Sequence, residues 1–102
     1  MKQSTIAIHE SQAPDEKTGA VITPIYQTTT FAQDVPGELK NGYDYSRSGN
    51  PTRTVLENVL AKMEGGTHGF TFASGMGALT TLIMAFMQSG DHIVVGLSLI
   101  HI

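Results

Sequence analysis

The charged residues of this chain are confined almost entirely to its first two thirds. The sequence contains six Lys and Arg and nine Asp and Glu residues, and all of them except Asp91 lie in residues 1–64. Residues 65–102 therefore lack the charged side chains that normally cover the surface of a small domain. This asymmetry predicts that the second half is buried within something larger, namely a longer chain, an oligomer or both.

The overall composition is that of a globular protein. Hydrophobic residues make up 40% of the 102 residues, and the length fits at most one domain. The absence of cysteine excludes a disulfide scaffold, a cysteine-based zinc site and a thiol nucleophile. A formal net charge of −3 argues against nucleic acid or an anionic membrane as a partner.

The sequence shows neither a targeting signal nor a membrane span. No apolar segment of the signal-peptide type precedes His9. Glycines interrupt the uncharged stretch 65–90, and its helix-like remainder is roughly 21 Å long, shorter than the ~30 Å hydrocarbon core of a bilayer. The sequence therefore predicts a cytoplasmic protein.

The first half is predicted to be mostly irregular. Turn residues recur through 1–20 and 33–50. The β-branched and aromatic segment 21–31 is typical of an extended arm or an edge strand, because Pro24 removes one donor from a strand ladder. No internal repeat accompanies these segments.

The second half predicts an α/β fold with parallel strands. Asn50 is a suitable N-cap for a helix that begins at Pro51 and ends before Gly65. Ser74 caps a second helix, which is apolar on most sides and is therefore expected to be buried. After the first helix, the predicted elements are a strand at 68–73, the second helix at about 75–88 and a strand at 92–95.

The segment 72–78 predicts a strand that passes through a turn of small residues into the second helix. Backbone N–H groups at a helix start favour a phosphate or carboxylate, and Gly75 and Gly77 let an anion approach closely. The segment matches neither a P-loop nor a nucleophile elbow, and Thr80 replaces the third glycine of a dinucleotide fingerprint. The alternative is that Ser74 only caps the helix and the glycines allow tight packing.

A second candidate lies in residues 42–52, where Tyr45 and Arg47 stand two positions apart. In an extended loop their side chains project to the same side, and a phenol beside a guanidinium can bind an oxyanion or a phosphate. The alternative is a surface loop in which Arg47 pairs with Asp44 and contributes little.

No catalytic or metal-binding residue is predicted. The four histidines are isolated from one another, and none has metal-ligand spacing. The lysines all occupy polar stretches or a solvent-facing helix position, so none is suited to Schiff-base chemistry: Lys2, Lys17, Lys40 and Lys62.

Several motifs, taken in order over about residues 18–96, resemble the N-terminal part of one enzyme family. The family comprises the trans-sulfuration (Cys/Met metabolism) pyridoxal-phosphate enzymes, which include cystathionine γ-synthase, the cystathionine lyases and methionine γ-lyase. The matching segments are TGAVITPIYQTTTF at 18–31, GYDYSRSGNPTRTVLE at 42–57, MEGG at 63–66, FASGMGAL at 72–79 and SGDH at 89–92.

The resemblance implies a cofactor site shared between subunits. The backbone N–H groups of Gly75 and Met76 would bind the phosphate of pyridoxal 5′-phosphate (PLP). Tyr45 and Arg47 would reach from one subunit to the same phosphate in its neighbour, so a homo-oligomer, either a dimer or a tetramer, is expected. The implied fold is the fold-type-I large domain, preceded by an N-terminal arm.

The implied organisation is an arm and cofactor-contacting loop at 1–50, the start of the PLP-binding domain at 51–96, and a tail at 97–102 without family character. The Schiff-base lysine and the substrate-binding arginine lie later in the family. The expected function is therefore that of an N-terminal fragment of an enzyme of the cystathionine γ-synthase or γ-lyase type, which performs γ-replacement or γ-elimination on sulfur amino acids. The alternative, favoured for the chain by itself, is a truncated non-catalytic product that at most oligomerises or binds phosphate weakly.

Overall fold

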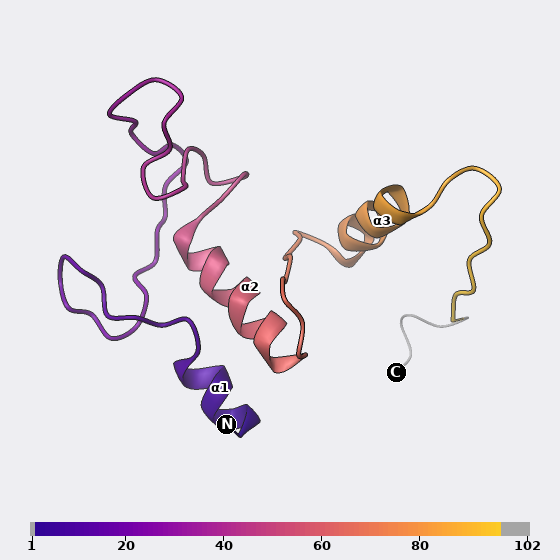
Figure 1. Ribbon diagram of the computed structural model, residues 1–102, viewed down its shortest axis with the longest axis horizontal. Helices are drawn as coiled ribbons and strands as arrows, with labels where there is room; N and C mark the ends of the chain where they lie inside the picture. Colours follow the sequence, from indigo (N-terminus) through magenta and orange to yellow (C-terminus); the bar gives the residue numbers. More distant parts are fainter. Residues whose placement is uncertain (1, 97–102) are drawn as a thin grey trace. The chain divides into compact units, whose positions relative to one another are not determined.

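The computed structural model describes residues 2–96, which contain three helices and no strand (Figure 1). Helix α1 spans Gln3–His9, α2 spans Pro51–Met63 and α3 spans Gly75–Phe86. The chain divides after Thr71 into two units, of which the first holds α1 and α2 and the second holds α3. The predicted tail at 97–102 lies outside the described residues.

Helix α2 begins and ends where the sequence predicts. The Asn50 side chain accepts a hydrogen bond from the Thr52 N–H at 2.9 Å, and Pro51 occupies the first turn, where its missing N–H costs nothing. At the other end Gly65 adopts a φ of +69°, a conformation that terminates helices and favours glycine. Helix α2 also carries the two buried apolar residues of the described chain, Val59 and Ala61.

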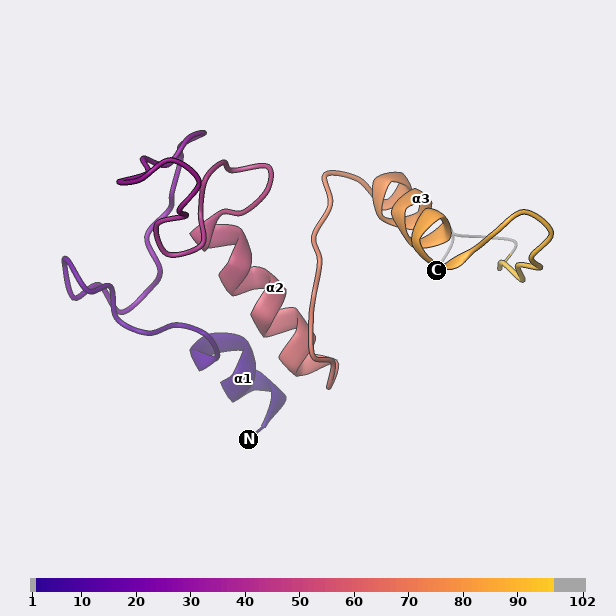
Figure 2. The ribbon, with the colours of Figure 1, turned by 45° about the horizontal axis from the view of Figure 1, so that its top comes forward.

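Helix α1 corrects the prediction that residues 1–20 are irregular. Its N-cap Lys2 makes no side-chain capping bond, and seven residues are too few for a helix that is stable by itself. Both views show α1 beside α2 (Figures 1 and 2), and Ala7 lines the same small hollow as Val59. Packing on α2, which local sequence signals do not report, therefore accounts for α1.

The strands predicted at 68–73 and 92–95 are absent from the described chain. The only pairing within residues 2–96 consists of two isolated antiparallel bridges, Thr30 to Tyr45 and Lys40 to Tyr43. A parallel strand needs a neighbouring strand to receive its backbone hydrogen bonds, and neither segment has one here. Within the first segment Thr71 instead lies against α2, where it donates its N–H to the Glu57 carboxylate at 3.0 Å.

Helix α3 forms as predicted but is exposed. Ser74 accepts from the Gly77 N–H at 3.0 Å, and the helix ends at Phe86, two residues earlier than expected. Within residues 2–96 no residue of α3 is buried, and Met84 and Phe86 are 78% and 81% exposed, so the expected burial of α3 would need a longer chain or an oligomer. No helix within residues 2–96 is long and apolar enough to cross a membrane.

A turn at Asp15 predicts one pH-dependent response. Its carboxylate accepts from the Thr18 hydroxyl at 2.8 Å and from the Thr18 N–H at 2.9 Å, and these bonds hold the pKa of Asp15 below its ordinary value. The stability that this turn contributes is therefore present above the unfolded-state pKa and is lost as the pH falls through the lower folded-state pKa.

The variant Thr18→Val removes the hydroxyl donor, so the Asp15 pKa should rise toward its ordinary value. An NMR titration of the Asp15 carboxyl carbon measures that midpoint. Thr18→Ser is the matched control, because it keeps the hydroxyl and should keep the low pKa. Equal midpoints in the two variants would contradict this account.

Candidate functional site

The loop that carries Tyr45 and Arg47 is held against the chain that precedes it. Phe31 N–H donates to the Asp44 carbonyl at 2.8 Å, and Ser46 N–H donates to the Thr29 carbonyl at 2.8 Å. These two bonds flank the isolated bridge at Tyr45. The phosphate-binding candidates of the first unit therefore lie on a backbone fixed from both sides.

Tyr45 and Arg47 come together through a turn, and not in the extended loop that the sequence predicts. Behind Tyr45 the chain turns, because its carbonyl accepts from the N–H groups of Ser48 and Gly49 at 3.0 and 2.9 Å. The turn places the Arg47 guanidinium carbon 4.7 Å from the centre of the Tyr45 ring, a cation–π contact. Tyr45 is half-buried and Arg47 is exposed, so the guanidinium can reach a ligand in solvent.

The alternative in which Arg47 pairs with Asp44 does not form. The ion pairs among residues 2–96 are Lys40 with Asp34 and Arg53 with Glu57. The Asp44 carboxylate instead accepts from the Tyr45 N–H at 2.7 Å. Within the described residues Arg47 forms no ion pair, and its guanidinium contacts the Tyr45 ring.

The start of α3 presents two open donors. The Gly77 N–H goes to the Ser74 hydroxyl oxygen and the Ala78 N–H goes to the Ser74 carbonyl. The N–H groups of Gly75 and Met76 have no acceptor anywhere in the described chain. A Cβ built on Gly75 would meet nothing within 4 Å, so Gly75 itself is not crowded by the described chain.

The four predicted ligands form two pairs. Tyr45 and Arg47 lie in the first unit, and Gly75 and Met76 lie in the second. The cap prediction for Ser74 is confirmed, and the open donors beside it are compatible with an anion at this helix start.

Arg53 contacts the loop that carries Tyr45 and Arg47, and the sequence predictions miss this contact. Its guanidinium donates to the carbonyl oxygens of Ser46, Arg47 and Ser48 at 2.9, 3.2 and 3.0 Å. The spacing of Arg53 and Glu57, four residues apart on one helix face, signals only the ion pair between them and not the bonds to the carbonyl oxygens.

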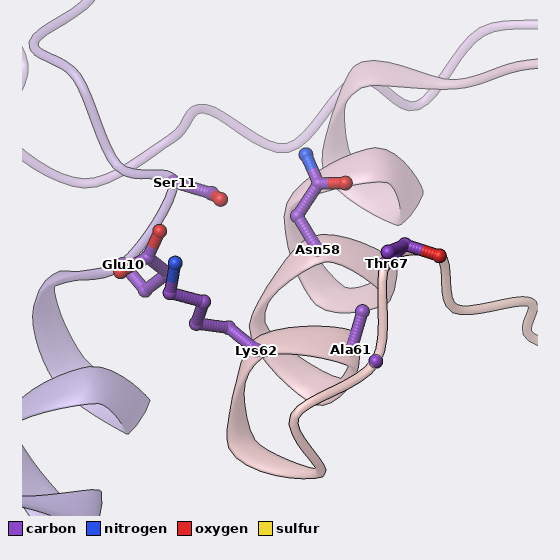
Figure 3. A pocket seen from close by; sticks show the side chains of 7 residues that line it. Glu10, Ser11, Asn58, Ala61, Lys62 and Thr67 are labelled. Atoms are coloured by element: carbon purple, nitrogen blue, oxygen red, sulfur yellow. The ribbon is translucent and has the colours of Figure 1, made fainter.

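A polar hollow beside the ends of α1 and α2 contains none of the four candidates. Its volume is about 390 Å³, and Figure 3 shows Lys62 extending toward Glu10 across it. The lining residues are Glu10, Ser11, Asn58, Ala61, Lys62, Gly66 and Thr67. Within residues 2–96 no group of three or more His, Asp or Glu side chains could hold a metal ion.

Comparison with known proteins finds relatives that are named as enzymes. A cystathionine beta-lyase of Coxiella burnetii is 55% identical over 91 residues, which are 89% of this chain and 23% of that protein. A probable cystathionine gamma-synthase of Herpetosiphon aurantiacus is 53% identical over 93 residues, or 91% of this chain and 28% of that protein. This chain therefore spans about a quarter of the length of these relatives.

Solved structures give the same assignment. The structure of metB from Corynebacterium glutamicum matches with a TM-score of 0.85 and 46% identity over 90% of this chain and 24% of that chain. Cystathionine gamma synthase from Xanthomonas oryzae pv. oryzae, in complex with cystathionine, matches with a TM-score of 0.80 and 40% identity over 89% of this chain and 23% of that chain.

These matches confirm the resemblance and the expected fold class, an incomplete part of the fold-type-I architecture. The family model that describes Cys/Met metabolism PLP-dependent enzymes matches residues 4–100. This chain belongs to the Cys/Met metabolism PLP-dependent enzyme family.

Proposed function

We propose that this chain supplies phosphate-binding elements of a PLP-dependent enzyme of the cystathionine γ-synthase or γ-lyase type. Such an enzyme replaces or eliminates a substituent at the γ-carbon of a sulfur amino acid. The observation that carries the proposal is the pair of open N–H donors at Gly75 and Met76, in a chain whose family binds PLP. The exposed Arg47 beside Tyr45 supports it.

The helix start fits a phosphate in both geometry and charge. Two adjacent N–H groups without an internal acceptor, at the positive end of a 12-residue helix, suit a doubly charged group. A Cβ at position 77 would lie 3.2 Å from the Ser74 hydroxyl oxygen, so glycine there leaves room for the cap that orients the first turn. These residues would hold the cofactor phosphate by backbone donors.

The loop of the first unit adds what backbone donors lack, a full positive charge. The Arg47 guanidinium can donate two parallel hydrogen bonds to phosphate oxygens, and the Tyr45 hydroxyl can donate a third. The contact between the Tyr45 ring and Arg47 limits the positions of the guanidinium before any ligand binds. When bound, PLP supplies an electron sink for carbanion chemistry at the substrate.

The proposal assigns a role to each part of the chain and requires more than one copy of it. Residues 1–50 would act as an arm and cofactor-contacting loop, and residues 51–96 would begin the PLP-binding domain. Tyr45 and Arg47 of one copy would complete the phosphate site of another, so the working unit is a homo-oligomer. The substrate would be a small sulfur amino acid, and the compartment would be the cytoplasm.

A second candidate function is a non-catalytic chain that self-associates or binds phosphate weakly. The exposed apolar residues of α3 favour it, since Met76, Met84 and Phe86 are each more than half exposed. The two candidates differ in cofactor recognition, because only the first requires Arg47 to contribute to affinity.

Pyridoxine 5′-phosphate is a suitable probe, because it carries the phosphate and lacks the aldehyde that reacts with surface lysines. The 102-residue chain should bind it more tightly than pyridoxine, which has no phosphate. Arg47→Ala should weaken binding roughly tenfold, equivalent to about 1.4 kcal/mol, through loss of a charge-assisted hydrogen bond. Equilibrium dialysis measures both affinities.

Lys62→Ala is the matched control, because it removes one positive charge from the exposed end of α2. It should leave the affinity unchanged. Equal binding of pyridoxine and its phosphate, or equal losses in Arg47→Ala and Lys62→Ala, would refute the proposed phosphate site.

A further inference from the structure

Arg53 holds the turn that carries Arg47. Three consecutive carbonyl oxygens, from Ser46, Arg47 and Ser48, accept from its two terminal nitrogens at distances of 2.9 to 3.2 Å. Carbonyl dipoles aimed at one point repel one another unless a cation lies between them. The planar fork of arginine satisfies all three, whereas the single ammonium of lysine does not match this geometry.

Glu57 connects this clamp to a second segment. Its Oε1 atom lies 3.5 Å from Arg53 Nε and also accepts from the Thr71 N–H at 3.0 Å and the Thr71 hydroxyl at 2.9 Å. The side chains of Arg53 and Glu57 are 31% and 19% exposed, so water competes only partly for these contacts. One face of α2 thereby holds both the turn at 45–49, through Arg53, and Thr71, through Glu57.

We propose that Arg53 is a positioning residue for the phosphate-binding pair Tyr45 and Arg47, and that Glu57 extends the same scaffold to Thr71. The inference rests on the proposed function, because it takes Tyr45 and Arg47 as phosphate ligands. Arg53 itself touches no ligand. It fixes the backbone on which the ligands stand, and a pre-ordered turn loses less conformational entropy when the phosphate binds.

A comparison of variants in two backgrounds tests this role. Pyridoxine 5′-phosphate is titrated into the 102-residue chain and affinity is followed by backbone NMR shifts. Arg53→Lys keeps the charge and removes the forked donors, and it should weaken binding roughly fivefold. In the background Tyr45→Phe/Arg47→Ala, the same change should cause no further loss, because the ligands that it positions are gone.

Lys62→Arg on the same helix is the matched exchange, and it should leave affinity unchanged in both backgrounds. Equal losses from Arg53→Lys in both backgrounds would overturn the inference, since they would indicate a folding effect or a direct contact. No loss in the wild-type background would also overturn it. If the Tyr45→Phe/Arg47→Ala variant binds as the wild type does, the proposed phosphate site fails and the positioning role fails with it.

The hydrogen bond from the Thr71 amide to Glu57 can be tested separately. Glu57→Ala should accelerate hydrogen exchange of the Thr71 amide roughly fivefold or more through loss of one hydrogen bond. Glu57→Gln retains an acceptor oxygen and should leave the exchange slow. Equal exchange rates in the two variants would overturn the link between Glu57 and Thr71.

Discussion

Replacing Gly69 by alanine is expected to destabilise the first unit by about 1–3 kcal/mol, the range for overpacking. A Cβ at this position would overlap the backbone carbonyl oxygen of Glu57 and would lie 3.4 Å from the Ala61 nitrogen. Both atoms belong to the backbone of α2, which cannot move aside as a flexible side chain can. The segment at 66–71 would therefore separate from α2.

That separation would also break the two hydrogen bonds from Thr71 to the Glu57 carboxylate, at 3.0 and 2.9 Å. Urea unfolding followed by circular dichroism measures the loss. Gly66→Ala is the matched control, because its Cβ would lie 3.6 Å from the nearest atom, an ordinary contact. Similar unfolding midpoints for the two variants would show that the close approach at Gly69 is unimportant.

Asn50→Ala is expected to cost about 2–4 kcal/mol, through loss of the helix cap and of two further hydrogen bonds. Its Oδ1 caps α2 at the Thr52 N–H, while its Nδ2 donates to the Tyr26 carbonyl at 3.0 Å and to the Ser46 hydroxyl at 3.1 Å. One side chain therefore joins the helix, the preceding segment and the candidate loop. Thermal and urea unfolding measure the total.

Asn50→Ser separates the two contributions, because serine keeps a capping oxygen and lacks the amide donors. It should lie between the wild type and Asn50→Ala in stability. Ser74→Ala, which removes only a cap, should cost about 1 kcal/mol. If Asn50→Ala costs no more than Ser74→Ala, the two hydrogen bonds from the Asn50 amide contribute nothing to stability, which would contradict the prediction.

Sequence reasoning succeeds where the interactions are local. Asn50 and Ser74 cap their helices because a cap needs only a side-chain oxygen and an N–H two or three residues later. The contact between Tyr45 and Arg47 is local as well, although a turn at 45–49 makes it and not the extended loop that the spacing predicts. Such features depend on a few neighbouring residues, so the local sequence is enough to predict that they form.

Sequence reasoning fails where a distant partner decides the outcome. Helix α1 depends on packing against α2, and the strand predicted at 68–73 has no neighbouring strand within the described residues. The sequence does not predict the contacts of Arg53, for a different reason. Its acceptors are backbone carbonyls, which every residue has, so no pattern of residue types marks them.

The clamp formed by Arg53 has a consequence for how this loop can evolve or be redesigned. Because Arg53 recognises main-chain oxygens, it makes no demand on the side chain at Ser48. Mutational drift at that position can change the local chemistry while the turn keeps its shape. The shape of the turn thus depends on Arg53, and the side chain presented at position 48 depends on a different residue. Position 48 is therefore a suitable place to vary the side chain in a mutant library that is screened for new ligands.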